Sequence, residues 1–145
     1  MDLNTFKRLY SNEDDTKAVM EQFLNEFDFN TGSVWFCRYL YNEGLTGPSF
    51  IAANRIGGFF QRSEHLLKDH FASVVVIKDP SLSHLSLTGF WILPGQEPNE
   101  KLRDVVDFES YKWEKADPTN PEHRQEIIDL ACWTEPHHAD GKILK

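Results

Sequence analysis

The side chains of this chain that could do chemistry are few and widely spaced. The two cysteines, Cys37 and Cys132, lie far apart in the sequence and form no C-x-x-C pair. This arrangement supports neither a zinc knuckle nor a redox motif. We interpret both as buried free thiols, because an unpaired cysteine behaves as a small apolar side chain. A nucleophile built from one of them and a distant histidine stays open, without a local signature to favour it.

The histidines offer no better metal site. His65 and His70 are five residues apart, and His137 and His138 are adjacent near the end of the chain. Neither pair fits H-E-x-x-H, and no carboxylate or cysteine stands at ligand spacing. His137 and His138 could hold a metal adventitiously. We interpret these histidines as exposed polar side chains, and we expect no metal and no cofactor.

Two adjacent glycines, Gly57 and Gly58, follow Asn54 and Arg55 and invite comparison with a phosphate cradle. The pattern matches neither G-x-x-x-x-G-K-[ST] nor G-x-G-x-x-G, so nucleotide binding is rejected. The favoured interpretation is close packing of a helix against a sheet.

Composition indicates one folded domain spanning residues 1–145. The chain is 40% apolar and holds 11 phenylalanines, four tryptophans and four tyrosines, which argues against disorder. A formal net charge of -8 disfavours direct nucleic-acid binding and attraction to anionic lipid. The longest aliphatic run, Val74–Ile77, is too short to span a bilayer, so we expect no membrane contact and a cytoplasmic protein.

The elements that must position these side chains follow from hydrophobic periodicity and from breakers. The run Phe71–Ile77 is continuously apolar and predicts a central strand with layers on both sides. The short turn after it favours an antiparallel hairpin with Leu85–Leu93. The other predicted elements, in chain order, are one or two helical turns at 4–10, a helix from caps at 11–15 to about 27, a strand at 34–41, a helical stripe from 56 toward 70, a mobile loop at 96–104, a strand at 109–113 and a helix at 121–132.

Several blocks in the same order resemble one known family. The blocks are Phe6-Lys7-Arg8-Leu9-Tyr10-Ser11-Asn12-Glu13-Asp14, Asn54 to Arg62 with Gly58-Phe59-Phe60-Gln61-Arg62, Phe71-Ala72-Ser73-Val74, Gly95-Gln96-Glu97, Glu109-Ser110-Tyr111-Lys112-Trp113 and the closing Asp140 to Lys145. Together they resemble the C-terminal domain of elongation factor 1-gamma over nearly the whole chain.

The resemblance implies an α+β fold, a single domain with an antiparallel sheet of about five strands flanked by helices. It implies a noncatalytic interaction or scaffold domain in the cytosolic complex that reloads elongation factor 1-alpha with GTP and so supports peptide chain elongation. Partners would be other subunits of that complex or ribosome-associated proteins, and exchange itself belongs to other subunits. Family members carry a glutathione-transferase-like domain and a lysine-rich linker before this region. We therefore expect an excised domain, or a short relative, that lacks their anchoring surface.

A partner surface is predicted around five residues: Gln61, Arg62, Glu109, Tyr111 and Trp113. Arginine and aromatic side chains are frequent at interaction hot spots, although tryptophan is more often part of a core. The alternative is a small-molecule-binding domain or an enzyme with an aromatic-lined cleft, which would require a deep pocket beside Tyr111 and Trp113.

Overall fold

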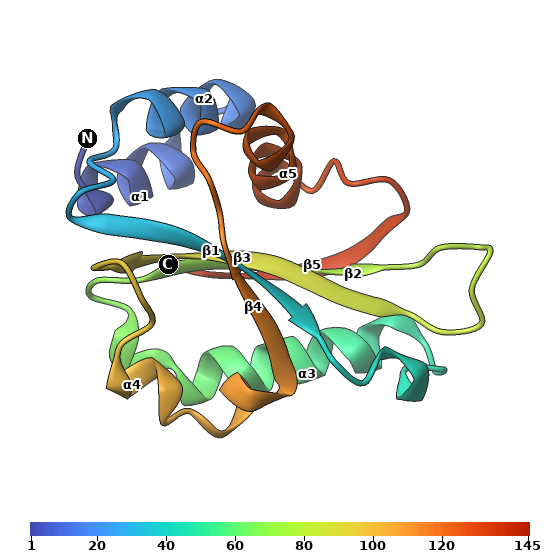
Figure 1. The fold of residues 1–145 in the computed structure, drawn as a ribbon. Coiled ribbons are helices and arrows are strands. Elements are labelled where there is room, and N and C mark those ends of the chain that lie inside the picture. Colours follow the sequence, from blue (N-terminus) through green and yellow to red (C-terminus); the bar gives the residue numbers. More distant parts are fainter.

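A five-stranded antiparallel sheet separates two layers of helices in the computed structural model, which describes residues 1–145 (Figure 1). The strand order is β4-β1-β3-β2-β5. The strands are β1 (Gly32–Tyr39), β2 (Phe71–Ile77), β3 (Ser86–Pro94), β4 (Tyr111–Lys115) and β5 (His138–Leu144). The helices are α1 (Leu3–Asn12), α2 (Thr16–Glu26), α3 (Ser49–Arg62), α4 (Glu100–Arg103) and α5 (Pro121–Cys132). The expected α+β fold is confirmed.

Strand β2 has the bounds and the burial that its apolar run predicted. It pairs antiparallel with β3 through the predicted hairpin and lies between β3 and β5. Because side chains alternate across a strand, Phe71 and Val75 enter one core, and Ala72 and Val74 enter the other. A strand buried on both faces therefore needs the two helical layers seen in Figure 1.

The layer of α1, α2 and α5 covers one face, at the top of Figure 1. Asp15, one of the predicted caps, accepts a hydrogen bond from the Ala18 backbone N–H at the start of α2. The inner face of α2 consists of Val19, Met20, Phe23 and Leu24, which are all buried. Helix α5 has its predicted bounds, with Asn120 as its cap and a proline at its first position.

Helix α3 covers the opposite face together with α4. It begins at Ser49, earlier than the predicted stripe, and ends at Arg62. The stripe predicted toward His70 is therefore too long, because a short 3-10 turn, Glu64–Leu66, replaces its last part. Ser63 ends the helix, and its hydroxyl donates to the Phe59 carbonyl at 2.8 Å.

Three predictions about the chain after β3 need correction. The loop predicted at 96–104 contains helix α4, because Leu102 is fully buried and holds it to the core. The strand predicted at 109–113 begins at Tyr111, after a 3-10 helix, η3 (Val106–Ser110). The edge strand β5 was not predicted, since Asp140 and Gly141 have low strand propensity and pairing with β2 supplies its order.

Strand β1 is shifted toward the N-terminus by comparison with the predicted range 34–41. Gly32 and Ser33 join it because they pair with the end of β3. None of the helices combines the length and the apolar composition that a membrane-spanning helix requires.

Candidate interaction surface

The five residues predicted to contact a partner separate into an exposed set and a core set. Gln61 and Arg62, at the end of α3, and Glu109, in η3, are exposed. Tyr111 is only 4% exposed, and Trp113 is half-buried. Gln61, Arg62 and Glu109 are therefore the exposed members of the predicted set, whereas Tyr111 belongs to the core and Trp113 packs against it.

A bidentate ion pair joins the two elements that carry the exposed set. Arg62 Nε donates to Asp107 Oδ1, and its Nη2 donates to Asp107 Oδ2, both at 2.7 Å. The hydrogen bonds to Asp107 raise the pKa of the Arg62 guanidinium above its usual value. This pair fixes the end of α3 against η3, two residues before Glu109.

The paired glycines of α3 explain this geometry in part. A Cβ at Gly58 would stand 2.8 Å from Arg62 Nη2. The Arg62 guanidinium can therefore occupy this position only because Gly58 has no side chain. Gly57 lies close to Lys142 of β5, where α3 packs on the sheet. The predicted role in close packing is thus confirmed for Gly57, whereas Gly58 accommodates an arginine.

Tyr111 and Trp113 belong to a cluster of aromatic side chains. The Tyr111 ring lies 5.2 Å from Phe59 and 5.4 Å from Tyr39, measured between centroids. Burial, the largest cause, raises the pKa of the Tyr111 hydroxyl. The Trp113 indole stacks on Phe108 at 4.6 Å and donates to the Phe108 carbonyl at 2.9 Å. The two rings position η3 and β4.

The region also contains a groove that the sequence had not indicated. It holds about 370 Å³ between the Gly44–Pro48 loop and α3, and Arg62 and Asp107 contribute to its lining. Arg55, also in its lining, was not among the predicted site residues. The sequence did contain a signal for Arg55. It lies seven residues before Arg62, two helical turns apart, so the two arginines share one face of α3.

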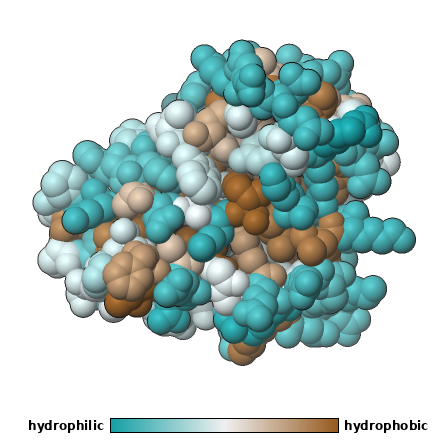
Figure 2. Space-filling model, turned by 180° about the vertical axis from the view of Figure 1, so that it is seen from behind, coloured by the Kyte–Doolittle hydropathy of each residue, from teal (hydrophilic) through white to brown (hydrophobic).

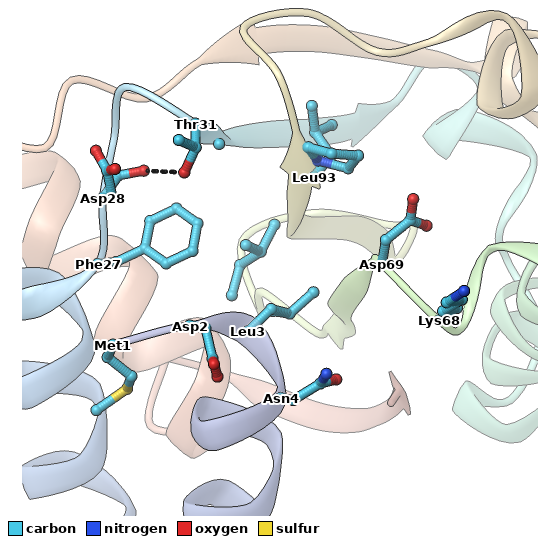
Figure 3. Close-up of a pocket in the computed structure, with 13 residues that line it drawn as sticks. Met1, Asp2, Leu3, Asn4, Phe27, Asp28, Thr31, Lys68, Asp69 and Leu93 are labelled. Carbon is cyan, nitrogen blue, oxygen red and sulfur yellow. Dashed lines mark hydrogen bonds between the residues drawn. The ribbon is translucent and has the colours of Figure 1, made fainter.

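No cleft of the kind required by the enzyme alternative lies beside the aromatic pair. Tyr111 and Trp113 line none of the five main cavities. The largest, about 520 Å³, lies between the start of α1 and the ends of β1 and β3. In Figure 3, Asp28 and Thr31 lie on one side of this cavity, and Lys68 and Asp69 lie on the other.

The carboxylates of this cavity already serve local structure. Asp2 caps α1, and the Asp28 carboxylate accepts a hydrogen bond from the backbone within its own turn at 2.9 Å. Asp69 Oδ1 lies 2.7 Å from His70 Nδ1. The cavity lining contains neither a histidine nor a cysteine.

The cysteines lie in the two separate cores and cannot pair. Cys37 is fully buried, as predicted, and burial raises the pKa of its thiol to about 12. Cys132 is only half-buried and packs on the opposite side of the sheet. No group of three or more histidine, cysteine, aspartate or glutamate side chains is arranged to hold a metal ion.

His70 corrects the interpretation of the histidines as exposed. It is fully buried, with its ring 6.1 Å from the Trp91 ring. Burial lowers its pKa below the ordinary value of 6.5, and the hydrogen bond with Asp69 only partly opposes this effect. His65 is exposed, as predicted, whereas His138 is half-buried and stacks on Trp133 at 5.1 Å.

The lowered pKa of His70 predicts a loss of stability in mild acid. As the pH falls through about 6.5, His70 becomes protonated in the unfolded chain before it does so in the folded protein. The unfolded state is therefore favoured, and the free energy of unfolding decreases below that pH. Urea unfolding at about pH 7.5 and about pH 5.5 measures the difference. We expect a smaller difference in His70→Gln than in the wild type, and an unchanged difference in the exposed control His65→Gln. Equal differences in all three proteins would contradict this assignment.

Comparison with known proteins gives consistent matches. A family model described as "Elongation factor 1 gamma, conserved domain" matches residues 1–97. The chain is 37% identical over 144 residues to elongation factor 1-gamma of Bos taurus and to that of Homo sapiens, covering 98% of this chain and 32% of each relative. It is 36% identical over 149 residues to the probable elongation factor 1-gamma of Caenorhabditis elegans, covering 99% of this chain and 37% of the relative. The chain spans about a third of the length of the curated relatives it matches.

Proposed function

The chain belongs to the elongation factor 1-gamma family, and from this membership we propose that residues 1–145 form a noncatalytic interaction domain that supports peptide chain elongation. The observation that carries the proposal is similarity over 98% of the chain to relatives named elongation factor 1-gamma. The proposed domain corresponds to the C-terminal part of those relatives, and its place of action is the cytoplasm.

The proposed partners are other subunits of the elongation factor 1 complex or ribosome-associated proteins. The proposed contact surface is the exposed set Gln61, Arg62 and Glu109, with Tyr111 and Trp113 as its support. The Arg62–Asp107 pair supports this choice, because it holds α3 and η3 in one fixed arrangement. A preorganised surface loses less conformational entropy when a partner binds.

Affinity capture from cytosolic extract tests this function. The immobilised domain is expected to recover components of the elongation factor 1 complex or ribosome-associated proteins, and Arg62→Ala is expected to recover several-fold less. Because the Asp107 side chain is only 13% exposed, Arg62→Ala leaves a largely buried carboxylate unpaired, so its melting temperature should fall by a few degrees while the domain stays folded at the assay temperature.

The matched control is Arg8→Ala, an exposed arginine on α1 in the other helical layer. It should recover as much as the wild type. The proposal fails if the wild-type domain recovers no such component while a full-length family member does.

A further inference from the structure

The groove beside α3 contains a guanidinium that no carboxylate neutralises. Its charged lining residues are Arg55, Arg62 and Asp107. Asp107 is bound by Arg62, whereas Arg55 belongs to none of the ion pairs of the protein. The groove therefore carries a local positive charge in a chain whose formal net charge is -8.

The position of Arg55 keeps its hydrogen-bond donors available. Its Cζ atom lies over the Tyr39 ring, 5.5 Å from the centroid. Contact with the ring stabilises the cation, and a guanidinium packed in this way can still donate from its edges. A carboxylate that enters the groove can accept these bonds in bidentate geometry.

Apolar side chains lie beside the free guanidinium. Ile51 lines the groove and is 54% exposed, and buried Leu45 and Leu85 also contribute to its lining. Tyr41, 58% exposed, lies 5.7 Å from the same Tyr39 ring that Arg55 covers. In Figure 2, which shows the molecule from behind, a small hydrophobic group lies at the lower left, on the side where α3 begins in Figure 1, and a larger one lies near the middle of the view.

We propose that this groove binds an acidic peptide segment of a partner protein, with one carboxylate on Arg55 and an apolar side chain of the segment against Ile51. The inference rests on the proposed interaction role and names the chemistry of the segment recognised. A volume of about 370 Å³ suits one or two anchoring side chains. The net charge of the chain does not prevent this contact, because physiological salt screens charges beyond about 8 Å.

A peptide fits the groove better than a nucleic acid does. Phosphate recognition needs a basic stripe, whereas the groove lining offers one guanidinium outside any ion pair, which suits a single carboxylate and not a run of phosphates. The exposed isoleucine and tyrosine supply the apolar contact that a peptide side chain uses.

Fluorescence polarisation with defined peptide pools tests the proposal. The probes are a labelled pool of short peptides made of aspartate, glutamate, leucine and phenylalanine, and a matched pool in which asparagine and glutamine replace the acids. The wild-type domain is expected to bind the acidic pool, and Arg55→Gln should weaken this binding by about tenfold. Ile51→Ser should weaken it also, and the amide pool should bind weakly to every variant.

Matched variants keep the result specific. Arg8→Gln makes the same change of net charge on an exposed arginine of α1, and Leu82→Ser removes an exposed leucine outside the groove lining. Both should bind the acidic pool like the wild type. Equal affinity of the wild type for the acidic and amide pools would overturn the proposal. A labelled oligouridine that binds the wild type and is lost from Arg55→Gln would overturn it in favour of RNA.

Capture from extract separates this inference from the proposed function. If Arg55→Gln recovers elongation-complex components as well as the wild type does, the groove proposal fails and the interaction role stands. If the wild type recovers none of them, the interaction role fails.

Discussion

Replacement of Phe59 by alanine is expected to lower the free energy of unfolding by about 3–5 kcal/mol. The Phe59 side chain is fully buried, and its ring lies 5.3 Å from Trp91 and 5.2 Å from Tyr111. The substitution removes the ring that joins α3 to these two strand residues and leaves a cavity. A domain of this size has about 5–15 kcal/mol of stability in total, so the melting temperature should fall by about 6–20 °C.

Phe50 provides the matched control, because it lies on the same helix and its side chain is 60% exposed. Phe50→Ala should change the free energy of unfolding by less than about 1 kcal/mol. Urea unfolding and calorimetry of the two variants measure the difference. Similar losses in both would contradict the placement of α3 on the sheet.

Replacement of Gly89 by alanine is also expected to lower the free energy of unfolding strongly. Gly89 lies in β3 between Cys37 of β1 and Val74 of β2. A Cβ there would stand 2.2 Å from the Ser73 carbonyl oxygen and 2.6 Å from the Val74 Cα. Both are backbone atoms of a central strand, which can move only by disturbing the ladder. Overpacking usually lowers the free energy of unfolding by about 1–3 kcal/mol. Because backbone atoms are in the way here, we expect a loss of about 3 kcal/mol or more.

Gly44 is the control for this substitution. A Cβ at Gly44 would meet no atom within 4 Å, and its backbone has no positive φ. Gly44→Ala should therefore keep the melting temperature of the wild type to within about 2 °C. The measurement is soluble yield together with thermal unfolding. A Gly89→Ala protein that melts like the wild type would show that β2 and β3 are not paired as described.

The elements with strong local signals were predictable from the sequence. The apolar run of β2 sets both its ends, and the Asn120-Pro121 pair sets the start of α5. The layers follow, because a strand that is apolar on both faces needs a cover on each side. The family resemblance supplied the strand count that local patterns did not reach.

The elements that depend on tertiary contact were not predictable. Strand β5 is polar along much of its length and is ordered by pairing with β2. Helix α4 depends on one buried leucine, Leu102, within a polar segment. Alternation alone also did not set the start of β4, because η3 occupies the preceding residues and places the Tyr111 ring in the core.

The candidate surface was predicted only in part. Arg62 and Glu109 lie on exposed, adjoining elements, but their link is Asp107, which no sequence pattern singled out. Arg55 was within the recognised block from Asn54 to Arg62, and only the fold shows that Tyr39 and the Gly44–Pro48 loop lie beside it. Contacts between residues far apart in sequence decide which exposed side chains form one surface.

Hydrogen exchange on the domain bound to its captured partner tests the central claim most directly, because it reports which backbone segments a partner covers. We expect slower exchange on binding in residues 44–62 and 106–110, which carry the groove and the exposed set. Residues 1–4, 27–32 and 68–69, around the largest cavity, should exchange as in the free domain. Protection confined to that cavity, with none in α3 or η3, would contradict the account.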